Sequence, residues 1–151
     1  GLVRIGPVTL DATARRPIPV IEEDGLRITG IGVPHGIVPT IAFRVEVGGY
    51  SIVFAGDQNG DDGSFVEFAK EADVLVMHMV VPENISGAGR ALHAPPSRIG
   101  EIAAAAEAKS LVLGHFMARS LRDLDANIAL VRTHYDGPVR AAEDLMCIPL
   151  D

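Results

Sequence analysis

Residues 25–60 read GLRITGIGVPHGIVPTIAFRVEVGGYSIVFAGDQNG, and they contain three short segments with the composition of β-strands. The first segment is Leu26–Gly32, and the next two, Thr40–Val47 and Tyr50–Ala55, flank the pair Gly48-Gly49. Two glycines between apolar segments are typical of a two-residue β-hairpin turn. We therefore predict that the second and third segments form an antiparallel hairpin.

Strand and helix signals alternate after this hairpin. Ser64 followed by Glu67 is a capping-box pattern, which predicts a helix that begins at Ser64 and runs to about Ala72. Further helices are expected from Pro95 or Pro96 to Lys109, and from a cap at Ser120 and Asp123 to the turn at 136–138. Further strands are expected at 74–77, 111–113, 139–142 and 146–148. This alternation predicts an α/β fold.

The size and composition of the chain limit what it can be. Its 151 residues make one ordinary domain, and 48% hydrophobic with 22% charged residues is typical of soluble globular proteins. No apolar run approaches the roughly 20 residues that span a bilayer, so we expect no membrane segment. The single cysteine, Cys147, excludes an intramolecular disulfide and fits a cytoplasmic protein. The chain begins with Gly1 rather than Met, which leaves open whether other residues precede it.

The charge of the chain disfavours nucleic acid as a partner. The net charge is −7, whereas phosphate backbones are bound by clustered lysines and arginines. The few basic pairs, such as Arg15 with Arg16, do not form a stripe. We expect a small anionic molecule, rather than a nucleic acid, as the substrate.

Three candidate metal ligands each follow the end of a predicted strand. They are His35, Asp57 and His115. Loops at strand ends usually carry the sites of α/β folds, and imidazole and carboxylate are ligands that Zn²⁺ accepts. Taken singly, each has a plainer interpretation, since a lone histidine is often structural and Gly-Asp is a common turn. It is the order and sequence context of all three together that favour a metal site.

That context resembles the metallo-β-lactamase superfamily, and specifically its zinc phosphodiesterase and tRNase Z-like branch, which includes arylsulfatase-like proteins. The resemblance rests on residues 25–60, on ADVLVMH from Ala72, on LHAPPSRIGEIAAAA from Leu92 and on LVLGHF from Leu111. It covers about Leu26–Phe116. It implies the C-terminal half of a four-layer αββα sandwich, as a mixed sheet with a β-hairpin and helices on one face.

The resemblance also implies roles for individual residues. His35, Asp57 and His115 correspond to ligands of a two-zinc site, with Asp57 as the carboxylate that bridges the ions. His93 corresponds to a histidine that assists catalysis and contacts the phosphate, although a solvent-exposed loop histidine is an equal alternative. The two ions and Asp57 would activate a water for attack on an ester, and His93 would stabilise the charge that develops on the substrate.

The chain departs from the family's pattern in several places. The His-x-His-x-Asp-His motif that supplies the other ligands is absent, and residues 1–24 contain no histidine. We therefore expect neither metal to reach normal coordination from this chain alone. The usual Gly-Asp-Thr is Gly56-Asp57-Gln58, and the His-Glu of tRNA-processing enzymes is His78-Met79, which disfavours tRNA processing. We expect His78 to be a core or supporting residue, and His134 to be structural.

The sequence thus predicts one domain over residues 1–151, the C-terminal part of a dinuclear-metal hydrolase that acts on a small anionic ester or phosphodiester. It is expected to be inactive without the missing half. An alternative is a non-catalytic module that forms homo-oligomers through its exposed sheet face. In a third possibility, a separate N-terminal polypeptide completes the site. Zinc, manganese and iron would all suit His and Asp ligands.

Overall fold

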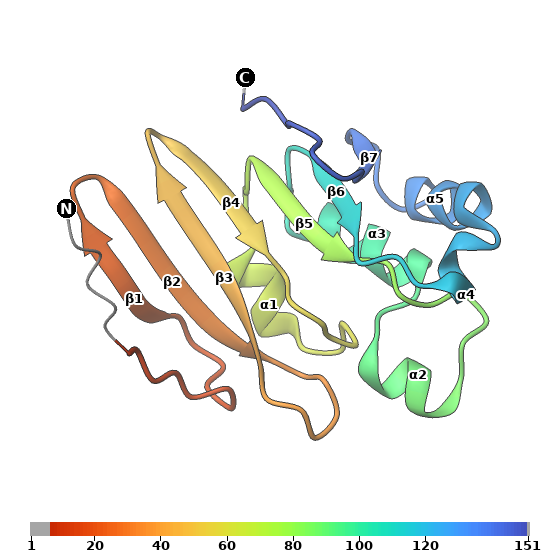
Figure 1. Cartoon of the computed structure of the whole chain (residues 1–151), viewed down its shortest axis with the longest axis horizontal. Helices are drawn as coiled ribbons and strands as arrows, with labels where there is room; N and C mark the ends of the chain where they lie inside the picture. Colours follow the sequence, from red (N-terminus) through yellow and green to blue (C-terminus); the bar gives the residue numbers. More distant parts are fainter. Residues whose placement is uncertain (1–6, 151) are drawn as a thin grey trace.

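The computed structural model describes residues 7–150, and one seven-stranded sheet with its strands in chain order organises them (Figure 1). The strands are β1 (Ile18–Glu23), β2 (Leu26–Val33), β3 (Thr40–Val47), β4 (Tyr50–Phe54), β5 (Val74–His78), β6 (Leu111–Gly114) and β7 (Val139–Ala141). Strands β1 to β4 pair antiparallel, and β4 to β7 pair parallel. Strands β2, β4, β5 and β6 therefore run in the same direction, so their C-terminal ends lie at one edge of the sheet.

The helices that contribute to the core pack on one face of this sheet, and a short one, residues 87–92, lies beyond its edge (Figure 1). The helices are α1 (Gly63–Phe68), α2 (Gly87–Leu92), α3 (Pro96–Ala105), α4 (Ala118–Leu121) and α5 (Leu124–Arg132). Figure 1 shows α1 and α3 behind the sheet. Alternate strand residues pack against them in one core, which includes Ile31, Val53, Leu75, Met77, Leu113, Phe65, Ile99, Ile102 and Val131. Burial of this apolar surface is the main stabilising contribution to the fold.

The opposite face of the sheet is apolar and partly open. Alternation along β3 and β4 places Val47 opposite Tyr50 and Phe43 opposite Phe54 on this face. Val47 and Phe54 are each 45% exposed, and Tyr50 is 40% exposed. Leu10, which approaches Gly30 on β2, covers one flank, while Ile148, Pro149 and Leu150 line a cavity beside Val74 and Val112 on the other. The expected arrangement, with helices on one face only, is confirmed.

The predicted hairpin is confirmed, but the expected start of α1 is wrong. The side chain of Asp62 accepts hydrogen bonds from the backbone N–H of Ser64, at 2.9 Å, and from its hydroxyl, at 2.6 Å. Asp62 is therefore the N-cap, and Ser64 lies inside the helix. The helix also ends at Phe68 rather than near Ala72.

Other differences concern short elements and the ends of helices. Strand β1 and helix α2 were not predicted, because Pro17, Pro19 and a glycine-rich segment obscure their patterns. The helix expected from Ser120 is divided into α4 and α5, with Asp123 as the N-cap of α5. Residues 146–148 do not form a strand, and α3 ends at Ala105 instead of Lys109. Among the described residues, no helix is long and apolar enough to cross a membrane.

Candidate metal centre

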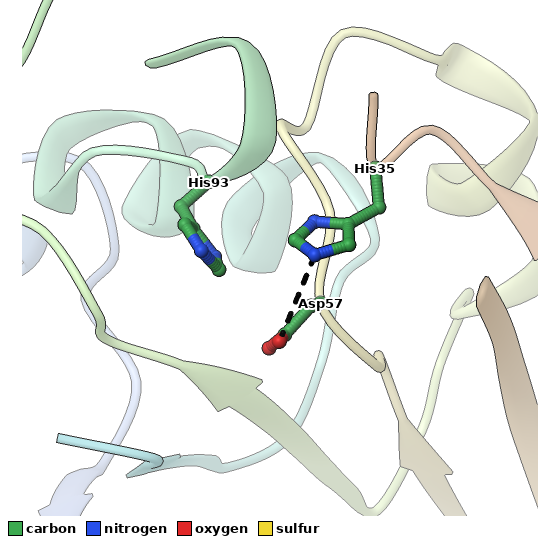
Figure 2. A group of neighbouring side chains, drawn as sticks. All are labelled: His35, Asp57 and His93. Carbon is green, nitrogen blue, oxygen red and sulfur yellow. Dashed lines mark ion pairs between the residues drawn. The ribbon is translucent and has the colours of Figure 1, made fainter. Parts of the chain in front are cut away.

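Four candidate site residues meet at the edge where β2, β4 and β6 end. His35 follows β2, Asp57 follows β4 and His115 follows β6, while His93 lies between α2 and α3. Figure 2 shows the rings of His35 and His93 side by side, with the Asp57 carboxylate next to them and a dashed line joining it to the ring of His35. Ligand atoms of these three residues all lie within 4.8 Å of one another. The structure thus brings together all the residues that the resemblance singled out, and adds His93 to the group of potential ligands.

A backbone carbonyl at the end of α2 decides which ring nitrogen of His35 carries the proton. Nδ1 of His35 lies 2.9 Å from the carbonyl oxygen of Leu92, and a carbonyl only accepts hydrogen bonds, so Nδ1 must donate. In the neutral ring Nε2 is then a bare acceptor, and it lies 4.0 Å from Oδ2 of Asp57. That distance is too long for a hydrogen bond but can be spanned by two ligands about 2.0–2.2 Å from one ion. A divalent cation could lie between these two side chains, since imidazole and carboxylate are both ligands that Zn²⁺ accepts.

The backbone at Asp57 is shaped by Gly56. Gly56 has φ +62°, in the left-handed region that favours glycine. A Cβ atom at this position would lie 2.9 Å from the carbonyl oxygen of Ile41 and 3.1 Å from Cγ2 of Thr40. Only glycine therefore allows the sharp turn after β4 that aims Asp57 at the site.

His115 completes the group on the side of β6. Its Nε2 atom lies 3.3 Å from Oδ2 of Asp57. The residue has φ +52°, which is costly for a side chain other than glycine and tends to persist at functional sites. Its side chain is half exposed, so a molecule entering from solvent can reach it.

His93 lies between two other histidine rings. Its ring centroid is 4.9 Å from that of His35 and 5.4 Å from that of His78. Burial lowers the pKa of His93, with Asp57 opposing and His35 adding to the effect. Burial also lowers the pKa of His78 to about 4. Both rings are therefore neutral at pH 7, and His78 is buried as expected, at 5% exposure.

A second set of contacts, which the sequence did not reveal, holds the loops of the site together. Arg90 of α2 donates to the carbonyl oxygen of Asn59 at 3.1 Å and bonds to Asp61 at 2.7 Å. The Asn59 side chain donates to the carbonyl oxygen of Ala91, and its backbone N–H donates to that of Pro34. These bonds join the loops that carry His35, Asp57 and His93. Nothing in the Gly-rich sequence around Arg90 signalled this role.

His134 does not take part in the site. It lies exposed just beyond the C-terminus of α5, with its Cβ next to Gly100 of α3. Its expected structural role stays a prediction.

The chain matches a known protein family over most of its length. A model of the β-lactamase superfamily domain matches residues 3–116. The comparison with curated proteins found no match.

Solved structures share the fold at low sequence identity. The metallo-β-lactamase fold protein YhfI from Bacillus subtilis is 24% identical with a TM-score of 0.72, over 87% of this chain and 51% of its own. Human short-form tRNase Z is 23% identical with a TM-score of 0.71, over 91% of this chain and 48% of its own. A diphosphatase of the PhnP family is 17% identical with a TM-score of 0.56, over 82% and 43%. The chain thus spans about half the length of these structures, and the likeness shows the fold.

Proposed function

Because this chain belongs to the β-lactamase superfamily domain family, we propose that it is part of a metal-dependent hydrolase acting on a small anionic ester or phosphodiester. The observation that carries the proposal is the pairing of His35 with Asp57. The bare Nε2 of His35 and the carboxylate of Asp57 face each other across 4.0 Å, and a divalent cation is the group that suits two such acceptors.

Each residue of the site has a role in this proposal. His35, Asp57 and His115 would hold the metal, the histidines through their rings and Asp57 through its carboxylate. When bound, a divalent ion would supply Lewis acidity for activating a water and polarising the ester. His93 faces the same space from the loop before α3, where it can contact the substrate oxygens and exchange a proton with them.

The site is proposed to be completed by a second half. Two-metal sites need more ligands than this chain presents, and its length is about half that of the YhfI and tRNase Z structures. The missing ligands would come from a His-x-His-x-Asp-His motif, either in a longer chain or in a separate polypeptide. Alone, the chain would bind one ion with three protein ligands and have little activity.

The proposed substrate class draws on the charges around the site. Arg119 of α4 makes the smallest of the contributions that lower the pKa of His93, after burial and the neighbouring histidines, so its positive charge acts at the site from a distance. The diphosphatase among the structural neighbours supports a phosphoester. Met79 in place of a glutamate and the net charge of −7 argue against tRNA, despite the tRNase Z likeness.

Complementation tests this function. A polypeptide with the His-x-His-x-Asp-His motif from the same genome is co-expressed with the chain, and hydrolysis of bis(p-nitrophenyl) phosphate is followed with added Zn²⁺. We expect turnover from the pair, none from either half and none from a pair with Asp57→Asn. Equal turnover from the wild-type and Asp57→Asn pairs would contradict the proposal.

A second candidate, a non-catalytic module that self-associates, is favoured by the open sheet face. The exposed side chains of Val47, Tyr50 and Phe54 form a continuous apolar surface on β3 and β4. Contiguous exposed apolar patches mark interaction sites, and a second copy of this chain is the proposed occupant. Analytical ultracentrifugation at micromolar concentration tests it, and a monomer would overturn it.

A further inference from the structure

Two buried ring nitrogens near the site lack a hydrogen-bond partner within residues 7–150. Among the described residues, three buried side-chain atoms lack a hydrogen bond: Nε2 of His78, Nδ1 of His93 and Oε1 of Gln58. A buried polar atom without a partner loses its hydrogen bonds to water and destabilises the fold, so two of them on neighbouring rings call for an explanation.

The hydrogen-bond character of His78 is fixed by its other nitrogen. Nδ1 of His78 lies 3.0 Å from the carbonyl oxygen of Gly56, which can only accept, so Nδ1 carries the proton. Nε2 of the neutral ring is therefore a bare acceptor. It needs a donor, and the backbone and side chains around it supply none.

His93 is the group that can supply this donor. The two ring centroids are 5.4 Å apart, with a tilt of 58° between the rings. Imidazoles joined by an N–H···N hydrogen bond of about 3 Å have centroids roughly 5 Å apart, so the spacing of these two rings suits such a bond. Met79, the residue after His78, offers no better acceptor, because it is fully buried and its thioether accepts hydrogen bonds only weakly.

We propose that Nδ1–H of His93 donates to Nε2 of His78, and that His78 is the positioning residue which fixes the tautomer and orientation of His93. The chain of contacts then runs from the Gly56 carbonyl through His78 to His93. It ties His93 to the turn that also aims Asp57. Ring partners of this kind orient histidines at metal sites, usually as carboxylates or carbonyls, and here a second histidine takes that place.

The consequence concerns the other nitrogen of His93. With the proton held on Nδ1, Nε2 is the bare nitrogen available to an ion or to a proton from the substrate. The catalytic role of His93 rests on the proposed function. The hydrogen bond between His93 and His78 does not, and it can be tested without any hydrolysis.

The test reads the histidine tautomers directly by NMR. The metal-free protein is labelled with ¹⁵N-histidine, and the ring nitrogens are assigned with single substitutions. We expect His93 in its Nδ1–H form, with a scalar coupling across the hydrogen bond to Nε2 of His78. Exposed His134, which lacks such a partner, should average both tautomers and serve as the internal reference.

Two substitutions at His78 provide the controls. His78→Leu removes the acceptor, so His93 should lose its fixed tautomer, while His78→Gln offers an oxygen near the Nε2 position and should restore it. His93 in the Nε2–H form in the wild type would overturn the proposal, and this spectrum decides even if His78→Leu fails to fold. An Nδ1–H form without coupling, unchanged in folded His78→Leu, would also overturn it, since another acceptor, such as Oε1 of Gln58 or a water, would then accept the hydrogen bond.

Discussion

Nε2 of His115 lies 3.3 Å from Oδ2 of Asp57, and the residue that makes this contact holds a φ of +52°. A left-handed conformation costs about 1–2 kcal/mol for a residue with a Cβ atom. The fold retains that strain at a position where the imidazole meets the carboxylate. Positive φ also occurs at Asp24, Glu71, Glu107 and Leu145. The functional role inferred for His115 therefore rests on its contact with Asp57 together with this conformation.

Two substitutions of His115 separate its ligand role from its backbone strain. His115→Gly and His115→Ala both remove the imidazole, so both should weaken zinc binding by about tenfold or more. Glycine alone relieves the left-handed strain, so His115→Gly should be more stable than His115→Ala by about 1 kcal/mol in urea denaturation of the metal-free protein. A less stable glycine variant would mean that the backbone is not strained there.

Gly56 is expected to be essential for the turn that carries Asp57. Alanine at this position meets the carbonyl oxygen of Ile41 at 2.9 Å and also adopts a left-handed conformation. We expect Gly56→Ala to lower the free energy of unfolding by about 2 kcal/mol or more and to weaken zinc binding.

Gly49 is the matched control, because it has φ +86° but a Cβ atom added there would meet nothing within 4 Å. Gly49→Ala should cost only about 1 kcal/mol and leave zinc affinity unchanged. Equal effects of the two substitutions on zinc affinity would count against the special role of Gly56.

The sequence predicted much of the sheet because its strands have strong local patterns. The hairpin around Gly48-Gly49 and the buried strands β5 and β6 follow from short apolar runs with clear turn signals. The cap of α1 was misplaced because Asp62 and Ser64 are both good caps, and only the three-dimensional contact with Ser64 N–H distinguishes them.

The candidate site was predicted less completely than the fold. Strand ends and sequence resemblance singled out His35, Asp57, His93 and His115, and the structure brings them together. The closeness of His78 to His93 could not be foreseen, because it depends on how the loop before α3 folds back over β5. The bonds of Arg90 to Asn59 and Asp61 are likewise long-range contacts without a local signal.

Asp73 lies away from the candidate metal site, and its carboxylate should make the free energy of unfolding depend on pH. Its carboxylate bonds to Lys109 at 2.7 Å and accepts from the backbone N–H of Ser51 at 2.6 Å, and the Lys109 hydrogen bond above all lowers its pKa. A lowered pKa means that the stabilising contribution is present above the unfolded value of about 3.9 and is lost as pH falls through the folded value.

Asp73→Asn tests this dependence. The variant should lose about 1 kcal/mol of unfolding free energy at pH 7, through weaker hydrogen bonds to Ser51. The difference from the wild type should shrink as pH falls below about 4. Urea denaturation of both proteins from pH 7 to pH 2 measures it, and a difference that stays constant with pH would refute the assignment.

The open sheet face predicts how self-association responds to charge. Phe54 is 45% exposed at the C-terminal end of β4 on this face, so Phe54→Glu should shift the sedimentation equilibrium to monomer if two copies pack there. Leu145 is fully exposed in the C-terminal segment and provides the control, since Leu145→Glu should leave association unchanged. Dimers that survive Phe54→Glu would place the interface elsewhere.

Metal content per chain tests the central claim most directly, because it asks whether His35 and Asp57 face each other across an ion. Gel-filtered protein is loaded with Zn²⁺, dialysed and analysed by plasma mass spectrometry, beside Asp57→Asn and the remote control Asp73→Asn. The account predicts about one equivalent in the wild type and in Asp73→Asn, and almost none in Asp57→Asn. Wild-type protein without zinc, or zinc retained in full by Asp57→Asn, would contradict it.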